Sequence, residues 1–309
     1  MSRIHEALKK AQQERTANHL GSIMEDSTEP SSSNGAVRTT DAPEVAIPHD
    51  IAATSAPKTD SRSLGFDELR ANCTRPPWNI DPNLMVFSST DPFAVGAEQF
   101  RTLRSRLYRI RESQPLRTVL IASAAPAEGK TFVAANLAQS FVRQRGCRVL
   151  LIDGDLRSPR LHSLLGAPSN PGLADYLQSE AKIFDVVQKS QNDDFFFIPA
   201  GNHVTHPSEL ISNGRFKELL ERLGPMFDWV IVDSPPILPV SDGSVLAGTC
   251  DGVLLVVRAG STPSEAAQRA CHELKNGKIV GVVLNTVEQD AGTYGYGHYG
   301  QPSSNASHK

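Results

Sequence analysis

The sequence Gly129-Lys130-Thr131 could bind the phosphate groups of a nucleotide. It ends the stretch SAAPAEGKT (123–131), which follows a short apolar run and precedes a helical pattern. A phosphate-binding loop needs this order of strand, loop and helix. Gly129 would let the backbone approach phosphate, and the N–H groups at the helix start would hold the anion. Lys130 would place its charge on the β- and γ-phosphates, and the Thr131 hydroxyl would ligate Mg²⁺.

The loop departs from the general motif at its first glycine, where Ala124 stands. The loop alone therefore leaves a second interpretation open, a fortuitous Gly-Lys-Thr at the start of a helix. If the loop binds a nucleotide, the contacts should come from the turn and the first residues of the helix. These residues are Ala127, Glu128, Gly129, Lys130, Thr131 and Phe132.

Two further apolar runs end in acidic residues that could hold a metal ion. The stretches VLLIDGDLR and WVIVDSPP contribute, in chain order, Asp153, Asp155, Arg157 and Asp233. Acids that follow parallel strands share the sheet edge with the phosphate-binding loop, where they can hold Mg²⁺ directly or through water. Each acid alone could equally be a solvated loop residue. The three stretches together predict a Mg–nucleotide site with Thr131, Asp153 and Asp233 as metal ligands.

The elements that would position these residues alternate along the chain. Short, nearly all-apolar runs predict strands at 118–123, 149–152, 195–198, 229–232, 253–257 and 279–284. Helical patterns separate most of them, as at 131–144, and Thr262-Pro263-Ser264-Glu265 predicts a helix with Thr262 as its N-cap. Strands that are apolar on both faces suit a parallel sheet covered by helices. We therefore predict a doubly wound, mostly parallel α/β fold with ligands at the carboxyl ends of the strands.

The composition changes at both ends of this predicted core. Residues 1–16 carry apolar residues at helical spacing and predict a short amphipathic helix. Residues 17–84 are rich in Ser, Thr, Pro and Ala with few large apolar residues, which predicts a disordered linker. Residues 290–309 are rich in Gly, Ser and Tyr and predict a flexible tail. The nucleotide-binding domain is therefore expected at 85–289.

The bulk composition excludes several classes of function. The formal net charge is −3, which gives no electrostatic reason to expect nucleic acid as a partner. The four cysteines form no CxxC pair and adjoin no histidine cluster, so we expect neither zinc nor a disulfide. No apolar run reaches the roughly 20 residues of a membrane span, and the charged N-terminus is unlike a signal peptide. We expect a cytoplasmic protein, and we expect any association with a membrane to come through a partner.

The three nucleotide motifs resemble those of the bacterial tyrosine kinases of the capsular and exopolysaccharide type. The matching residues are Gly129-Lys130-Thr131, Asp153-x-Asp155-x-Arg157 and Asp233-x-Pro235. Three other features are similar to the same family over about 85–300. They are an ExxRxxR oligomerisation motif (Glu98, Arg101, Arg104), the segment His206-Pro207-Ser208-Glu209-Leu210, which has His where the family has Asn, and a tail cluster of tyrosines (Tyr294, Tyr296, Tyr299).

The resemblance implies a protein tyrosine kinase that uses ATP and Mg²⁺ and phosphorylates its own tail, with Tyr294, Tyr296 and Tyr299 as acceptors. The implied catalytic residues are Lys130, Asp153, Asp155 and Asp233, with Asp153 accepting or orienting the tyrosine proton. Arg157 would steady a phosphate or a neighbouring acid. Asn285, after the last strand, would read adenine or simply form a turn.

The resemblance also implies an assembly and a partner. Glu98, Arg101 and Arg104 would lie on one helix face and form the interface of a ring-like homo-oligomer; weak exposed pairs are the other interpretation. A separate membrane-embedded polysaccharide co-polymerase would activate the kinase, recruit it to the inner face of the plasma membrane and so link it to exopolysaccharide synthesis or export.

Two other functions remain open, and a departure from the family pattern bears on the first of them. Ala127 stands where the family has glycine, and it would be strained if that position needs φ > 0. A non-catalytic, nucleotide-gated scaffold is therefore one alternative. The other is a division-site or partitioning type of switch ATPase. Those ATPases carry an extra lysine five positions before Lys130, where this chain has Ala125.

Overall fold

A seven-stranded sheet forms the centre of the computed structural model, which describes residues 64–80, 82, 84–88, 95–191, 193–275 and 277–287. The strand order is β3-β4-β2-β5-β1-β6-β7, and every neighbouring pair is parallel except β3 and β4. The strands are β1 (Thr118–Ser123), β2 (Val149–Asp153), β3 (Gln188–Lys189), β4 (Phe195–Ile198), β5 (Trp229–Asp233), β6 (Gly252–Arg258) and β7 (Ile279–Asn285). The predicted fold class is confirmed. The antiparallel edge strand β3 was not predicted, because two polar residues carry no strand pattern.

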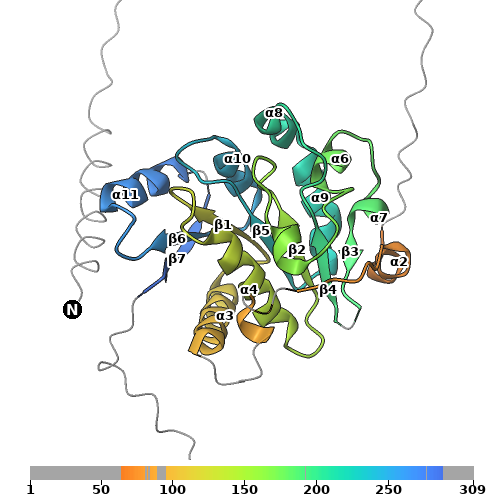
Figure 1. The fold of residues 1–309 in the computed structure, drawn as a ribbon, viewed down its shortest axis with the longest axis horizontal. Helices are drawn as coiled ribbons and strands as arrows, with labels where there is room; N and C mark the ends of the chain where they lie inside the picture. Colours follow the sequence, from red (N-terminus) through yellow and green to blue (C-terminus); the bar gives the residue numbers. More distant parts are fainter. Residues whose placement is uncertain are drawn as a thin grey trace, which may run out of the picture. The chain divides into compact units, whose positions relative to one another are not determined.

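Helices cover both faces of this sheet (Figure 1). The α-helices are α2 (Phe66–Asn72), α3 (Val95–Ser113), α4 (Lys130–Val142), α5 (Leu161–Leu165), α6 (Leu173–Leu177), α7 (Ile183–Val186), α8 (Pro207–Ser212), α9 (Arg215–Leu223), α10 (Asp242–Thr249) and α11 (Ser264–Glu273). Two short 3₁₀ helices, η1 (Val86–Ser88) and η2 (Gly224–Met226), join them. Within this described part of the chain, none of the helices is both long and apolar enough to cross a membrane.

The strands divide the core into two layers, because successive side chains point to opposite faces. On one face, Val119 and Ile121 of β1 pack in one cluster with residues of α3 and α4. On the other face, Leu120 packs in a second cluster with residues of α9, α10 and α11. The central strands β1, β2 and β5 are completely buried, which explains why their sequences are continuously apolar.

The fold begins before the predicted boundary at residue 85. In α2, Leu69 is fully buried, and the Phe66 ring lies edge-on to Phe196 of β4 at 5.8 Å between centroids. The Thr74 N–H then donates to the Val187 carbonyl at 3.1 Å. Residues 64–80 therefore belong to the folded domain, although the sequence analysis placed them in the linker. The low apolar content of 17–84 as a whole hid this short stretch. The predicted 1–16 helix and the tail tyrosines lie outside the described residues.

Candidate active site

The phosphate-binding loop connects β1 to α4 at the carboxyl edge of the sheet. Gly129 precedes the first residue of α4 and has a φ of 93°, a left-handed conformation. A Cβ atom on Gly129 would overlap the Asn285 side chain, so both the conformation and the space require glycine. The Asn285 amide also donates from Nδ2 to the Glu128 carbonyl at 3.0 Å. Asn285 therefore braces the loop, and its proposed reading of adenine stays a prediction.

Ala127 has a φ of 62°, so the loop does require a left-handed residue where this chain has alanine. That conformation costs an L-residue about 1 kcal/mol or more relative to glycine. The loop nevertheless keeps this left-handed conformation at Ala127. Its contacts with neighbouring elements must therefore offset the strain at Ala127.

The Lys130 side chain points to the second acidic motif. Its Nζ lies 3.2 Å from Oδ2 of Asp155, and both side chains are largely buried. An ammonium group on a flexible stem can exchange this carboxylate for a phosphate without moving the backbone. The arrangement joins the loop to the segment after β2.

Asp153 and Asp233 lie side by side at the ends of two paired strands. They are partners in the parallel register of β2 and β5, and both are almost fully buried. Asp153 accepts backbone hydrogen bonds from Asp155 (3.2 Å) and Leu161 (3.1 Å). Within the described residues, neither carboxylate oxygen of Asp233 accepts a hydrogen bond of good geometry, although the nearby Thr131 side chain and Ser234 backbone oppose the rise that burial causes in its pKa. A buried carboxylate without partners is costly, which points to a ligand that supplies them.

The surroundings make both acids hard to ionise. Burial, and then the neighbouring Asp233 carboxylate, raise the pKa of Asp153 well above its usual range. Burial likewise raises the pKa of Asp233 to about 6, although the Lys130 ammonium opposes the shift. Paired carboxylates with raised pKa values are typical of sites that bind cations or transfer protons.

The pair of acids suits a magnesium ion that takes only some of its ligands from the protein. The described residues contain no group of three or more His, Cys, Asp or Glu side chains that could hold a metal ion. Mg²⁺ usually takes one or two carboxylates and completes its shell with water and substrate phosphates. The unpartnered Asp233 oxygens match that requirement.

Arg157 contacts an acid that the sequence analysis did not single out. Its guanidinium donates from Nε to Asp242 Oδ2 (2.7 Å) and from Nη2 to Asp242 Oδ1 (3.1 Å). Ser208 of α8 donates to the same carboxylate. Burial raises the pKa of Asp242, but these hydrogen bonds outweigh burial and hold the pKa below its usual value. Of the two predicted roles of Arg157, the structure shows contact with a neighbouring acid.

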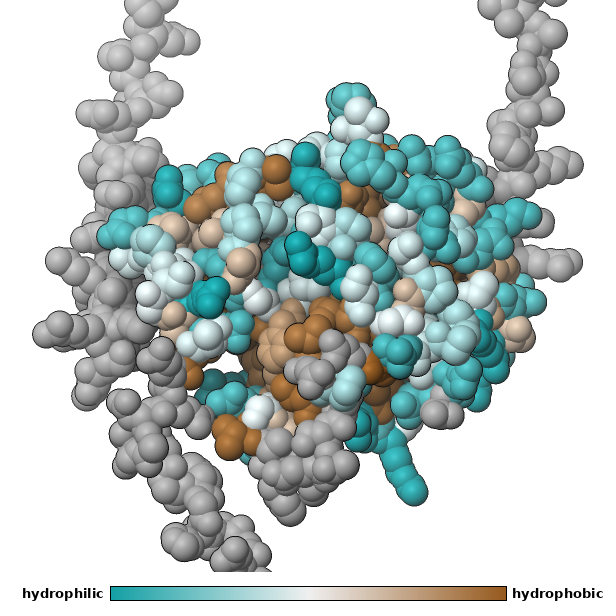
Figure 2. Space-filling view, viewed as in Figure 1, coloured by the Kyte–Doolittle hydropathy of each residue, from teal (hydrophilic) through white to brown (hydrophobic). Residues whose placement is uncertain are grey.

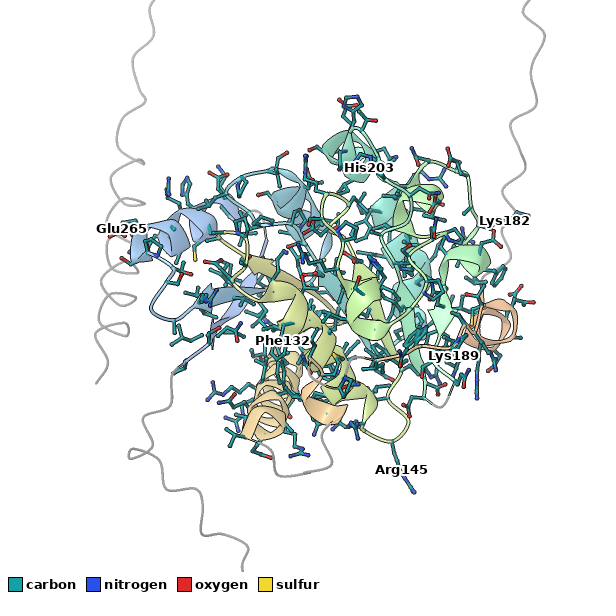
Figure 3. All side chains as sticks on the ribbon, viewed as in Figure 1. Phe132, Arg145, Lys182, Lys189, His203 and Glu265 are labelled. Carbon is teal, nitrogen blue, oxygen red and sulfur yellow. The ribbon has the colours of Figure 1, made fainter. Side chains whose placement is uncertain are left out.

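Phe132 does not line the loop with its ring. The side chain leaves α4 toward α3 (Figure 3), and its ring centroid lies 5.9 Å from that of Phe100. Only its backbone, in the first turn of α4, is placed to help hold an anion. The sequence could not separate these two possibilities, because one residue offers both a ring and an N–H group.

The predicted oligomerisation residues divide into two groups. Glu98 and Arg101 form an ion pair of 3.0 Å on α3, where the Glu98 side chain is 65% exposed. Arg104 instead donates to the Ser140 carbonyl of α4. In this structure, Arg104 therefore joins two helices of the same chain.

Comparison with known proteins identifies the family. The AAA-domain family model matches residues 117–277, and tyrosine-protein kinase YwqD of Bacillus subtilis (strain 168) is 35% identical over 217 residues, which cover 70% of this chain and 91% of that protein. The chain belongs to the bacterial tyrosine-kinase family.

Other tyrosine kinases agree in sequence and in structure. Tyrosine-protein kinase CpsD of Streptococcus agalactiae is 31% identical, covering 66% of this chain and 90% of that protein. The solved kinase domain of Escherichia coli tyrosine kinase ETK is 31% identical with a TM-score of 0.64, covering 73% of this chain and 88% of that one. Putative tyrosine-protein kinase AmsA of Erwinia amylovora is 37% identical, but the match spans 30% of its length. A nucleotide-binding domain is therefore the part that these tyrosine kinases share with this chain.

Proposed function

We propose that this chain transfers the γ-phosphoryl group of ATP to tyrosine hydroxyls, including Tyr294, Tyr296 and Tyr299 of its own tail. The supporting observation is that the loop lysine and two buried acids, Asp153 and Asp233, meet at one edge of the sheet. The relatives' names supply the reaction class, and the acids supply the charge and proton chemistry that the class requires.

Each residue has a distinct role in this proposal. Lys130 leaves Asp155 and binds the β- and γ-phosphates together with the loop N–H groups. Thr131, Asp153 and Asp233 hold Mg²⁺, partly through water, and the ion supplies neutralisation of the phosphate charge. The tyrosine oxygen forms a bond to the γ-phosphorus as the bond to the β-phosphate oxygen breaks. Asp153 accepts the tyrosine proton as that bond forms.

Asp155 and Arg157 support the site from the segment that follows β2. Asp155 pairs with Lys130 and, through Oδ1, accepts the Ser158 N–H at 3.0 Å, which fixes the turn. Arg157 ties the same segment to Asp242 at the start of α10. Their role is therefore to place the acids and the lysine relative to one another.

The proposal extends to a ring-like homo-oligomer in which each tail reaches a neighbour's active site through an interface at α3. Figure 2 shows a mostly hydrophilic face on which hydrophobic residues gather around the position that α4 has in Figure 1. Near the start of α3, Val95 is 58% exposed and Leu84 is 43% exposed. An exposed apolar residue such as Val95, on the same helix as the Glu98–Arg101 pair, is consistent with a surface that a second copy covers.

By family resemblance, the activator is a membrane-embedded polysaccharide co-polymerase, which brings the kinase to the inner face of the plasma membrane. Phosphorylation then regulates exopolysaccharide synthesis or export. This part of the proposal rests on the resemblance and not on a contact within the described residues.

Incubation with ATP labelled on its γ-phosphate separates the proposal from its two alternatives. A kinase places the label on tyrosine, a switch ATPase releases it as free phosphate, and a nucleotide-gated scaffold does neither. The reaction contains Mg²⁺ and is run with and without the cytoplasmic end of a candidate activator. Label that never reaches tyrosine under either condition contradicts the proposal.

A further inference from the structure

The turn between β6 and α11 contacts the phosphate-binding loop through a chain of hydrogen bonds. The Arg258 N–H donates to Thr262 Oγ1 at 3.1 Å, and the Thr262 hydroxyl donates to Oε1 of Glu128. Oε2 of Glu128 accepts the Ala125 N–H at 2.9 Å. This series of hydrogen bonds therefore connects the end of β6 to the first half of the loop. Thr262 was predicted as the helix N-cap, but α11 starts one residue later, with Pro263 in that position.

Two further hydrogen bonds hold the carbonyl groups at the middle of the loop. Arg258 donates from Nη1 to the Ala127 carbonyl at 3.4 Å, and Asn285 donates from Nδ2 to the Glu128 carbonyl at 3.0 Å. These carbonyl groups belong to successive residues, so the two contacts fix the orientation of both peptide planes. Glu128 is 4% exposed, and its two carboxylate oxygens each accept one hydrogen bond, from Thr262 and from Ala125.

These contacts surround the one loop residue that is in an unfavourable conformation. Ala127 has a φ of 62°, where an alanine is disfavoured by about fivefold or more relative to glycine. The hydrogen bonds from outside the loop hold Ala127 and Glu128, and the Glu128 carboxylate in turn holds the Ala125 N–H, so the backbone is held on both sides of the strained residue.

We propose that Thr262 and Arg258 are positioning residues for nucleotide binding. They fix Glu128 and the peptide planes beside it, and so keep the loop N–H groups in the shape that receives phosphate although Ala127 replaces a glycine. Neither residue needs to touch the nucleotide. This inference rests on the proposed function in one respect, that the loop binds a nucleotide.

The test is a double-mutant cycle between Thr262 and Ala127, read as Mg–ADP affinity by calorimetry on the full chain. Thr262→Val keeps the shape and removes the hydroxyl, and we expect about fivefold weaker binding. Thr262→Ser keeps the hydroxyl and should bind within about twofold of the wild type. Ala127→Gly should recover most of the lost affinity in Thr262→Val, and should raise affinity more there than in the wild type, because glycine needs no brace.

Controls separate this coupling from a general loss of stability. Thr249→Val removes a half-buried hydroxyl that donates to the Leu246 carbonyl within α10 and should leave affinity unchanged. Arg258→Gln changes an exposed side chain and should weaken Mg–ADP binding by about twofold. It provides the test if Thr262→Val does not fold. Wild-type affinity in both Thr262→Val and Arg258→Gln, or an equal effect of Ala127→Gly with and without Thr262, overturns the inference. If the wild type binds no Mg–ADP, the proposed function fails, and the inference fails with it.

Discussion

Nζ of Lys130 lies 3.2 Å from Oδ2 of Asp155, so the charge expected to meet the phosphates is paired with a carboxylate of the second acidic motif. We therefore expect bound nucleotide to compete with Asp155 for Lys130. The pair also keeps the lysine directed at the site, since both side chains are largely buried.

The replacement of Asp155 should therefore strengthen nucleotide binding and slow phosphoryl transfer. In Asp155→Asn, Lys130 has no competing carboxylate, and one negative charge near the phosphates is gone. We expect about fivefold tighter binding of ADP without Mg²⁺, about 1 kcal/mol. Phosphoryl transfer should fall because the site loses its geometry. Calorimetry with ADP and EDTA measures the first effect, and weaker binding than in the wild type would show that the ion pair does not compete.

Asp233 should make the stability of the protein depend on pH. Its pKa is about 6 in the folded protein, against about 3.9 for an unperturbed Asp, so the folded state holds more protons between these values. The stabilising effect is complete below about pH 4 and is lost as the pH rises through about 6. Asp233→Asn, which mimics the protonated acid, should add roughly 1–3 kcal/mol to the free energy of unfolding at pH 7.5 and about 1 kcal/mol or less at pH 4.5.

Urea unfolding of Asp233→Asn at the two pH values measures this effect. Glu180→Gln, which changes an exposed acid, is the matched control and should be neutral at both. The same Asp233 variant should lose tyrosine phosphorylation, since it removes a proposed Mg²⁺ ligand. A variant less stable than the wild type at pH 7.5 would contradict the assignment of Asp233 as a buried, unpartnered charge.

Removing the partner of Asp242 should loosen the segment after β2. In Arg157→Gln, the fully buried Asp242 carboxylate keeps only the Ser208 hydroxyl among its side-chain partners seen here. We expect a loss of roughly 2 kcal/mol, below the value for a fully buried pair because Arg157 is 38% exposed. The lowered pKa of Asp242 stabilises the fold above its usual pKa, and this is lost as the pH falls. The gap between wild type and variant, measured by urea unfolding, should therefore narrow in acid.

The interface proposed at α3 makes a prediction about oligomer size. Glu98 and Arg101 are paired on an exposed part of α3, whereas Arg104 bonds to α4. Arg101→Ala with Glu98→Ala should therefore dissociate the oligomer, measured by light scattering after sizing chromatography. Arg109→Ala, on an exposed residue of the same helix, is the control. An unchanged mass for the double variant rejects the interface.

The sequence was sufficient to predict the central strands and to single out candidate site residues at their ends. It was not sufficient to predict the contacts between distant loops. Continuous apolar runs located β1, β2 and β5 because these strands are buried on both faces. Lys130, Asp153 and Asp233 were recognisable because each follows such a run. Thr262 and Asp242 were not, since their partners Glu128 and Arg157 lie 134 and 85 positions away in the chain and no periodic pattern links them.

The central claim is that the chain phosphorylates tyrosines of its own C-terminal tail, and these tyrosines lie outside the described residues. The most direct measurement is mass spectrometry of the full chain after incubation with ATP and Mg²⁺, beside Lys130→Met treated in the same way. We predict phosphate on Tyr294, Tyr296 or Tyr299 in the wild type and at least about a hundredfold less in the variant, which lacks the charge that binds the phosphates. Equal tyrosine phosphorylation of the two proteins, or none in either with an activator present, would contradict the account.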